Sequence, residues 1–282
     1  MNPEEALQRA GGAARWKELI DSGVGRAALV AAVQRGTVVR RLYGTYSLPA
    51  TREAVWLAAA FHAQLTCVSL CDELGLPLLK RPPSVHLLVP DSRGLKFSDT
   101  RPLGRIVLHR SDASWAEAGQ SPVAAAIDIA AGCVDRYAQL ALVDASLAAG
   151  TLYPGDLREF HHTPPERRRW IIDHCDRDSQ SIMETYARVR LTRAGFKVRS
   201  QVVVGPRGHR DLVIEDCVIV ELDGWETHGN TAAFREDRRL DRAAIRAGKP
   251  TLRYTFADLF GRDRADLVAD VTAALNLVRK SA

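Results

Sequence analysis

The first fifty residues contain two segments with apolar positions at helical spacing, followed by an alternating segment. Residues 12–36 predict two short helices, because each apolar stripe ends at a glycine that can close a helix. Residues 37–49 alternate β-branched or aromatic positions around Tyr43-Gly44, which predicts a β-hairpin. Helix, turn, helix and hairpin in this order are typical of a winged helix-turn-helix, so we expect one over residues 1–50.

Residues 51–160 mix long apolar segments with two short strand-like runs. A single helix is predicted from the start of this region to Gly75, and residues 84–90 and 104–110 have the pattern of strands. Two apolar helices follow the strands, so we expect a central α+β domain. The prolines and arginines of residues 161–180 predict a linker after it.

Residues 181–282 predict the element order α-β-β-β-α-β-α. A capped helix is followed by a strand and a strongly apolar hairpin, and an amphipathic helix then leads to a core strand and a closing helix. The fold class expected for the whole chain is therefore mixed α+β. The expected elements of this part are a helix at 181–195, a strand at 197–204, a hairpin at 208–224, a helix at 230–248, a strand at 251–256 and a helix at 257–278.

Length and composition suit a globular chain of two or three domains. The chain has 282 residues, of which 46% are hydrophobic and 26% charged. The first ten residues include two glutamates and no apolar core of a signal peptide. No run approaches the roughly 20 apolar residues of a membrane span. We therefore expect a cytoplasmic protein without a membrane partner.

The five cysteines are scattered along the chain, which predicts reduced thiols and no disulfide framework. His62, Cys67 and Cys71 lie close in sequence, but no second ligand pair follows at the spacing of a zinc site. Small buried cysteines on an apolar helix are therefore expected there.

The net charge of +5 is distributed unevenly along the chain. Residues 1–50 hold seven Lys and Arg against four Asp and Glu, residues 51–165 hold ten against twelve, and residues 166–282 hold 22 against 18. Two basic ends suit a polyanion such as DNA. The alternative is a packing or protein-contact module with solvated arginines. The candidate DNA contacts in the first segment are Arg26, Gln34, Arg40 and Arg41.

Three acidic residues mark the predicted hairpin of the last part. Asp211 opens one strand, and Glu221 and Asp223 stand two apart at the end of the next, on one face and about 6.6 Å from each other. Carboxylates within an apolar strand are costly unless a positive charge compensates them. We therefore expect these three residues to bind Mg²⁺ or Mn²⁺, which would activate water against a phosphodiester.

Glu184 and His228 each have two interpretations. Ser181 and Glu184 fit a helix-capping box, which explains both without chemistry, although a glutamate in the first helical turn can also approach a metal. His228, five residues beyond Asp223, is a candidate general acid or base near neutral pH. The alternative for His228 is a loop histidine with local hydrogen bonds.

Four arginines of the last part are candidates for contacts with DNA phosphates or for neutralising the carboxylates. Structural ion pairing would explain them equally well. They are Arg210, Arg238, Arg239 and Arg253.

The length of the hairpin loop decides whether the carboxylates can meet. A two-residue turn after Ile214 would place Asp211 on the face opposite Glu221. A three-residue loop pairs Ile214 with Val218. In that register Asp211 lies across from Glu221. We predict the three-residue loop or a one-residue bulge, because a shared metal needs this arrangement.

The polar residues from Ser181 to Thr255 resemble those of very-short-patch-repair-like (Vsr-like) endonuclease domains, which have a restriction-endonuclease-like, or PD-(D/E)xK, fold. The resemblance implies an αβββαβα domain over residues 181–282 and a Mg²⁺-dependent endonuclease. The matching pieces are S-x-x-E at 181–184, V-E-x-D-G-x-x-x-H at 220–228, D-R-R-x-D at 237–241 and G-x-x-x-L-R-Y-T at 248–255.

The same resemblance implies roles for individual residues. Asp211 and Glu221 match the motif acids, Glu184 matches the helix acid, and His228 matches a histidine of the Vsr-like nickases. Asp223 stands where the motif usually has a lysine, so His228 or an arginine would have to replace that lysine.

Residues 5–49, and more loosely the region to about residue 160, resemble the N-terminal part of AbiEi-like antitoxins of abortive-infection systems. In that family this part binds DNA as a repressor. We therefore expect a DNA endonuclease or nickase with an N-terminal DNA-binding module, acting with a protein partner in repair or phage defence. The alternative is a non-catalytic DNA-binding regulator or antitoxin.

Overall fold

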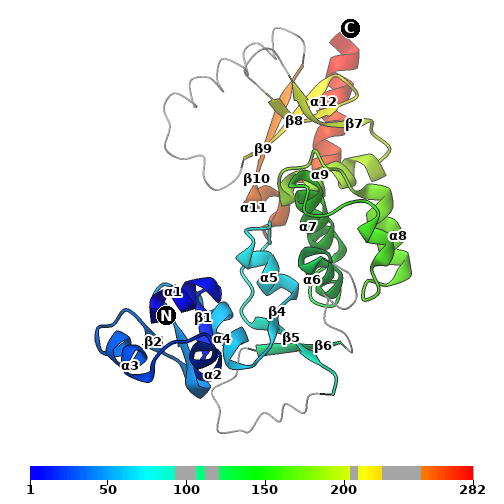
Figure 1. The fold of residues 1–282 in the computed structure, drawn as a ribbon. Coiled ribbons are helices and arrows are strands. Elements are labelled where there is room, and N and C mark those ends of the chain that lie inside the picture. Colours follow the sequence, from blue (N-terminus) through cyan, green and yellow to red (C-terminus); the bar gives the residue numbers. More distant parts are fainter. Residues whose placement is uncertain (93–105, 112–120, 204–208, 224–248, 282) are drawn as a thin grey trace. The chain divides into compact units, whose positions relative to one another are not determined.

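The computed structural model describes residues 1–92, 106–111, 121–203, 209–223 and 249–281. The described residues form a mixed α+β structure of helices and three small sheets (Figure 1). Contacts divide the chain into two units. Unit 1 comprises residues 1–134 and 155–164, and unit 2 comprises residues 135–154 and 165–282. No helix in the described parts of the chain is long and apolar enough to cross a membrane.

Unit 1 begins with helices packed around an antiparallel sheet of three strands. Leu7, Leu19 and Leu29, one from each helix, are buried in a common core, which explains the apolar stripes. The predicted hairpin is confirmed, but the first predicted helix begins only at Trp16, because residues 13–15 pair with β3. The elements are α1 (Pro3–Arg9), β1 (Ala13–Arg15), α2 (Trp16–Asp21), α3 (Arg26–Gln34), β2 (Val39–Arg40), η1 (Leu42–Gly44) and β3 (Thr45–Ser47), with β3 between β1 and β2.

The central part of unit 1 holds a second sheet, in which β5 lies between β4 and β6. Both predicted strands are confirmed, and they pair in parallel. The single helix predicted up to Gly75 is wrong. It is interrupted at His62, whose φ is 46°, because residues 64–65 pair with β5 instead of continuing the helix. The elements are α4 (Glu53–Ala60), β4 (Gln64–Leu65), α5 (Cys67–Glu73), β5 (Val85–Pro90), β6 (Ile106–Ser111) and α6 (Pro122–Ala130).

Residues 155–164 return to unit 1 and include η2 (Asp156–Glu159). Asp128 on α6 accepts hydrogen bonds from the backbone N–H groups of three consecutive residues, His161 to Thr163, at 2.7–2.9 Å. Three donors on one buried carboxylate hold this segment against α6. The beginning of the predicted linker therefore belongs to a folded unit.

Unit 2 begins before residue 181, where the last domain was expected to start. It includes α7 (Arg136–Ala148), and most of the predicted linker is helix α8 (Pro165–His174). Pro165 starts α8, where its missing N–H has no intrahelical partner to lose. Helix α7 packs against α8 and α9 (Ile182–Arg193), so this helical layer belongs with the C-terminal sheet and not with a separate connecting domain.

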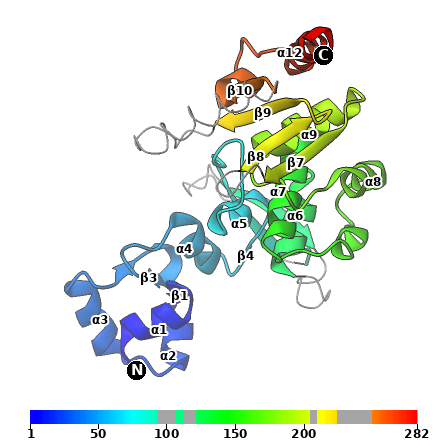
Figure 2. The same ribbon diagram turned by 90° about the horizontal axis from the view of Figure 1, so that it is seen from above.

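A four-stranded sheet forms the centre of unit 2, in the spatial order β10-β9-β8-β7 (Figure 2). Strand β10 is parallel to β9, and the other neighbours are antiparallel. Helix α9 packs on β7 and β8, and α12 packs on β9. The helix expected at 230–248 lies outside the described residues. The elements are β7 (Val198–Val203), β8 (His209–Ile214), β9 (Val218–Asp223), β10 (Thr251–Thr255), α11 (Phe256–Phe260) and α12 (Leu267–Ser281).

The single closing helix expected after β10 is wrong, since two helices follow this strand. Thr255 caps α11 through a reciprocal pair of hydrogen bonds with Asp258. Gly261 ends α11 at a position where a Cβ atom would collide with the carbonyl group of Ala257. Periodicity did not indicate this interruption, because apolar positions resume in phase beyond it.

The loop between β8 and β9 has the predicted length. Glu215 and Asp216 adopt left-handed φ values of 50° and 57° without a glycine. The register is therefore the predicted one, and its continuation sets Asp211 across from Glu221. The paired residues are Leu212 with Val220, Val213 with Ile219, and Ile214 with Val218.

Candidate functional site

The four predicted site carboxylates that the structure describes lie on neighbouring elements of unit 2. Asp211 is on β8, Glu221 and Asp223 are on β9, and Glu184 is in the first turn of α9. The β8–β9 ladder ends one pair before Asp211 and Glu221. Beyond the ladder, Asp211 Oδ2 accepts the backbone N–H of Leu222 at 2.8 Å, so the Asp211 carboxylate bridges the two strands.

Glu184 connects α9 to the sheet. Its Oε2 accepts hydrogen bonds from the Gln201 amide at 2.8 Å and from the backbone N–H of Gln180 at 3.0 Å. Ser181 Oγ accepts the N–H of Glu184 at 3.2 Å, so the predicted cap by Ser181 is confirmed, but the Glu184 carboxylate accepts the N–H of Gln180 and does not complete a capping box. Capping does not remove Glu184 from the site, because this buried carboxylate still interacts electrostatically with Asp211.

Burial raises the pKa values of Glu184, Asp211 and Glu221 above those usual for carboxyl groups. Like-charge repulsion adds to this effect, since Asp211 acts on Glu184 and Glu221, and Asp223 acts on Asp211. Hydrogen bonds from backbone N–H groups and from Arg210 oppose the increase. The four carboxylates therefore form one electrostatically coupled set, which additional positive charge would stabilise.

Two arginines balance part of this negative charge. Arg210 Nη1 lies 2.6 Å from Glu221 Oε1, and the Arg210 side chain is buried. Arg253 Nη1 lies 3.6 Å from Asp223 Oδ1, and the β10–β9 register places Arg253 beside Glu221. A DNA contact by Arg210, as predicted, would require this buried guanidinium group to leave Glu221.

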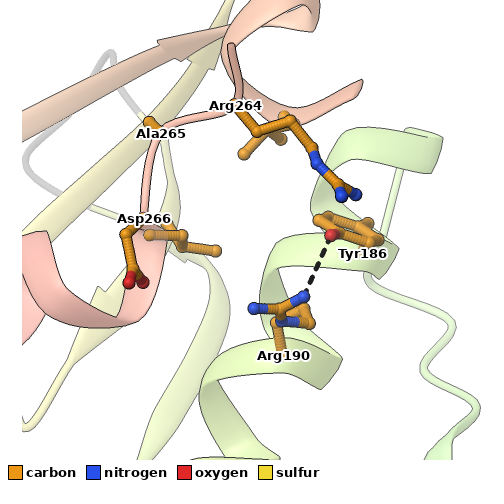
Figure 3. A pocket seen from close by; sticks show the side chains of 7 residues that line it. Tyr186, Arg190, Arg264, Ala265 and Asp266 are labelled. Carbon is orange, nitrogen blue, oxygen red and sulfur yellow. Dashed lines mark hydrogen bonds between the residues drawn. The ribbon is translucent and has the colours of Figure 1, made fainter. Parts of the chain in front are cut away.

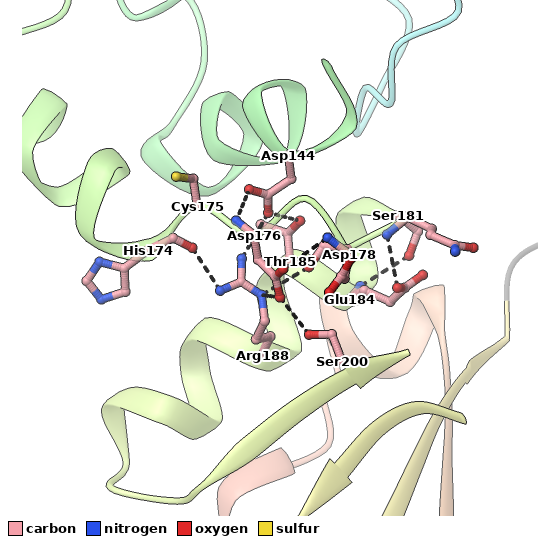
Figure 4. Close-up of polar contacts among 12 residues, drawn as sticks. Asp144, His174, Cys175, Asp176, Asp178, Ser181, Glu184, Thr185, Arg188 and Ser200 are labelled. Carbon is pink, nitrogen blue, oxygen red and sulfur yellow. Dashed lines mark hydrogen bonds and ion pairs between the residues drawn. The ribbon is translucent and has the colours of Figure 1, made fainter. Parts of the chain in front are cut away.

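A buried polar network around Arg188 fixes the position of α9 (Figure 4). The Arg188 guanidinium lies 2.9 Å from Asp144 Oδ2 on α7 and 3.4 Å from Asp176 Oδ2. Ser200 on β7 donates to Asp176 at 2.7 Å, which links the network to the sheet. Burial raises the pKa of Asp144 to about 6. Because Glu184 stands one helical turn before Arg188, this network also holds the site carboxylate in place.

The remaining predicted site residues fall into two groups. Those outside the described residues are His228, Arg238 and Arg239. Those exposed on α3 and β2 of unit 1, as a DNA contact requires, are Arg26, Gln34 and Arg40.

Arg41 differs from these exposed residues because its side chain is partly buried in unit 1. Its Nε donates to Ser47 Oγ at 3.0 Å, and its guanidinium carbon lies 5.3 Å from the ring centroid of Trp56. Arg41 therefore has a packing role, and a phosphate contact would require it to leave these partners.

A pocket of unit 2 is lined by α9, α11 and the residues leading into α12 (Figure 3). Arg190 donates to the Tyr186 hydroxyl at 3.2 Å, and Arg264 and Asp266 also line the pocket. None of the site carboxylates lines it. The carboxylate set remains the better candidate, because it concentrates buried charge and the pocket does not.

Several of these features were not expected from the sequence. Gln201 reaches Glu184 from a strand position with a φ of 46°, a distortion that no residue type predicts. The ion pair of Arg188 and Asp144 joins two helices, and each charge stands among apolar residues. A charged residue within an apolar helical stripe was the available signal for this pair.

Known proteins show little similarity to this chain. No family model matches it, and no curated protein matches it. The crystal structure of the RV2827C protein from Mycobacterium tuberculosis is similar over 61% of this chain and 75% of that chain, with 13% sequence identity and a TM-score of 0.35. A similarity this weak carries no argument about fold or function.

Proposed function

We propose that the chain is a metal-dependent DNA endonuclease or nickase whose active site is the carboxylate set of unit 2. The observation that carries the proposal is the charge balance of this set. Four coupled carboxylates, three of them with pKa values raised by burial, are ion-paired with only two arginines among the described residues. A partly buried site with surplus negative charge favours binding of a cation.

Mg²⁺ or Mn²⁺ fits this donor set, because hard divalent cations prefer carboxylate oxygens. Asp211, Glu221 and Asp223 would hold the ion, which when bound supplies activated water and charge stabilisation for phosphodiester hydrolysis. Gln201 donates a hydrogen bond to Glu184 and lowers the pKa of Asp211, so it would orient the acids. Arg253, beside Asp223, would offset phosphate charge in the place of the missing motif lysine.

The arrangement of elements supports the proposed domain types. Helix α9, the antiparallel strands β7 to β9 and the parallel strand β10 agree with a restriction-endonuclease-like core. The order α1-β1-α2-α3-β2-β3 agrees with a winged helix, and its exposed residues Arg26, Gln34 and Arg40 suit duplex DNA. The N-terminal part would then hold DNA near the nuclease, which cuts it.

A non-catalytic DNA-binding regulator is the second candidate. It is favoured by the partners that the carboxylates already have within the chain. Asp211 accepts the Leu222 N–H, Glu221 pairs with Arg210, and Glu184 accepts two donors. Such contacts stabilise ionised acids without a metal. The two candidates differ in one measurable property, which is cleavage.

Cleavage of supercoiled plasmid by the full chain tests the proposal, with Mg²⁺, with Mn²⁺ and with EDTA. We expect nicking or cutting only with a divalent cation. Asp211→Asn and Glu221→Gln should each lower the rate by about a hundredfold or more, because losing a ligand exceeds the roughly 10–100-fold effect of a group that only orients one. Affinity for duplex DNA should stay near that of the parent.

The matched control is Asp216→Asn. Asp216 lies in the loop of the same hairpin, but it is exposed and pairs with Lys197 at 2.9 Å. This variant should cut as fast as the parent. Equal rates for Asp211→Asn and the parent would contradict the assigned site, and duplex binding without cleavage under any metal would favour the regulator.

A further inference from the structure

Unit 1 contains a compact group of four side chains that the proposed function does not use. One nitrogen or sulfur atom of each lies within 4.8 Å of all the others. The four residues come from separate places in the fold, namely the first residue of α5, strands β5 and β6, and the turn after α6. We call them the Cys/His cluster; they are Cys67, His86, His109 and Cys133.

Distances within the Cys/His cluster are close to those around a tetrahedral zinc ion. Cys133 Sγ lies 3.8 Å from His86 Nδ1 and 3.9 Å from His109 Nε2, and these two nitrogens are 2.9 Å apart. Zn–S bonds of about 2.3 Å and Zn–N bonds of about 2.0–2.1 Å place tetrahedral ligand atoms roughly 3.3–3.8 Å from one another. The two stacked imidazole rings would have to separate to accept the ion, and all four ligand atoms already lie within 4.8 Å of one another.

The backbone at Cys67 shows that its position in the cluster is specifically maintained. Its φ is 53°, a left-handed value that is unfavourable for residues other than glycine. The preceding Thr66 donates its N–H to the carbonyl of His86 at 3.2 Å, and Ser69 Oγ accepts the N–H of His86 at 2.9 Å. These contacts tie the start of α5 to β5 and hold the Cys67 thiol beside the imidazoles.

The chemistry of the Cys/His cluster is that of a soft metal site. Each histidine offers one ring nitrogen to the cluster, His86 from a buried position and His109 from a partly buried one. Cys67 is fully buried and offers its sulfur atom to the same group as Cys133. Sulfur and imidazole ligands suit Zn²⁺ and do not suit Mg²⁺.

We propose that the Cys/His cluster binds a Zn²⁺ ion as a structural site, separate from the carboxylate set. Four protein ligands complete a tetrahedron and leave no open position for a substrate, which distinguishes structural from catalytic zinc. The ion would join α5, β5, β6 and the end of α6, across chain segments of 19, 23 and 24 residues between successive ligands. It thereby stabilises the central part of unit 1. Cys133, the exposed member, provides a route for metal entry.

Metal analysis of the full-length, reduced protein tests the proposal directly. We expect about one zinc per chain by plasma mass spectrometry, either as purified or after incubation with Zn²⁺ and gel filtration. Replacement by Co²⁺ should give the strong visible bands of a tetrahedral ion together with thiolate charge transfer. Zinc far below stoichiometry in both preparations, or iron in its place, would overturn the proposal.

Three variants separate a metal site from ordinary packing. Cys133→Ser removes an exposed ligand, so we expect a folded protein whose zinc affinity falls at least about tenfold. Cys71→Ser is the matched control, because Cys71 is a buried cysteine on the same helix as Cys67 but outside the cluster. It should keep its zinc. His109→Cys should also keep the ion, with stronger thiolate charge transfer in the Co²⁺ form.

The unfolding temperature provides a second readout that does not depend on the variants folding equally well. A chelator should lower the unfolding temperature of the parent and of Cys71→Ser, and it should lower that of Cys133→Ser by less. Equal zinc affinity in Cys133→Ser and the parent would contradict the proposal. A Cys67–Cys133 disulfide in protein that takes up no metal after reduction would contradict it as well.

Discussion

The side chains of the Cys/His cluster in unit 1 and of the carboxylate set in unit 2 have different kinds of polar partner. The cluster brings nitrogen and sulfur atoms of neutral side chains together at 2.9–3.9 Å. In the carboxylate set, by contrast, three of the four acids accept hydrogen bonds from the chain, for example Asp211 from the Leu222 N–H and Glu221 from Arg210. A metal would displace the contact between the His86 and His109 rings in the first group, whereas in the second it must compete with backbone N–H groups and charged arginines.

This difference separates the metals that the two groups would take and the roles that those metals would have. Soft nitrogen and sulfur ligands select Zn²⁺, and carboxylate oxygens select Mg²⁺ or Mn²⁺. A closed set of four ligands stabilises a fold, while an open, negatively charged set can accept water and phosphate. The number of acidic residues at a site therefore does not by itself indicate whether the site binds a metal.

The largest stability effect that should separate the two regions comes from Arg188. Arg188→Met leaves Asp144 buried without its ion-pair partner, which should lower the free energy of unfolding of unit 2 by about 3–5 kcal/mol. Denaturant unfolding measures this loss, and zinc content should not change, because the Cys/His cluster lies in unit 1. Arg199→Met, which removes an exposed partner of Asp216, is the control and should have a much smaller effect. Equal effects would mean that the network does not support α9.

The pH dependence of stability should be of opposite sign in the two regions. The pKa of Asp144 is about 6 in the folded chain, against a usual value of 3.8, so between these pH values only the folded state keeps the proton. The contribution of Asp144 to stability is thus greatest below about pH 4 and falls, by up to about 3 kcal/mol, as the pH rises to about 6. Acid should instead weaken the zinc site, because protons compete for its ligands.

Urea unfolding of the parent and of Asp144→Asn between pH 4 and pH 7 isolates the Asp144 contribution. The stability of the parent relative to the variant should decrease as the pH rises through this range. Zinc release, followed with a chromophoric chelator, should increase as the pH falls. Parallel stability curves for the two proteins would show that the pKa of Asp144 is not raised on folding.

Regular elements of the fold were predictable where one period dominated the local sequence. The β8–β9 register followed from the requirement that Asp211 and Glu221 share a face, and the observed three-residue loop confirms it. The interruption at His62 was not predictable, because residues 54–71 are mostly apolar and the pairing of residues 64–65 with β5 is a tertiary contact. Strand pairing overrode a strong local helical preference there.

The two candidate sites differed in predictability for a related reason. Acids such as Glu221 stand out in an apolar strand, so sequence alone was sufficient to find them. The ligands of the Cys/His cluster are spread over four elements, and no short spacing connects them. They meet only because β5 and β6 pair in parallel and because Cys67 adopts a left-handed φ.

The smallest predicted effect concerns the adjacent residues Arg40 and Arg41. Like the two metal-site candidates, they differ in whether the side chain already has a partner within the chain. Arg40 is exposed on β2, whereas Arg41 bonds to Ser47 and stacks on Trp56. If Arg40 contacts one phosphate, Arg40→Ala should lower the slope of log affinity against log salt by about 0.9. Arg41→Ala should leave the slope unchanged and slightly lower the unfolding temperature of unit 1.

Titration of a labelled DNA duplex at several salt concentrations measures the slope for both variants under the same conditions. If both variants lowered the slope equally, Arg41 would have to leave Ser47 and Trp56 to bind a phosphate. The DNA-binding surface would then include a residue that is partly buried in the protein without DNA. An unchanged slope in both variants, with affinity intact, would mean that the hairpin does not contact DNA. Because an exposed arginine contributes to the salt dependence only when it displaces counterions from phosphates, that outcome would favour a protein partner for this face of unit 1.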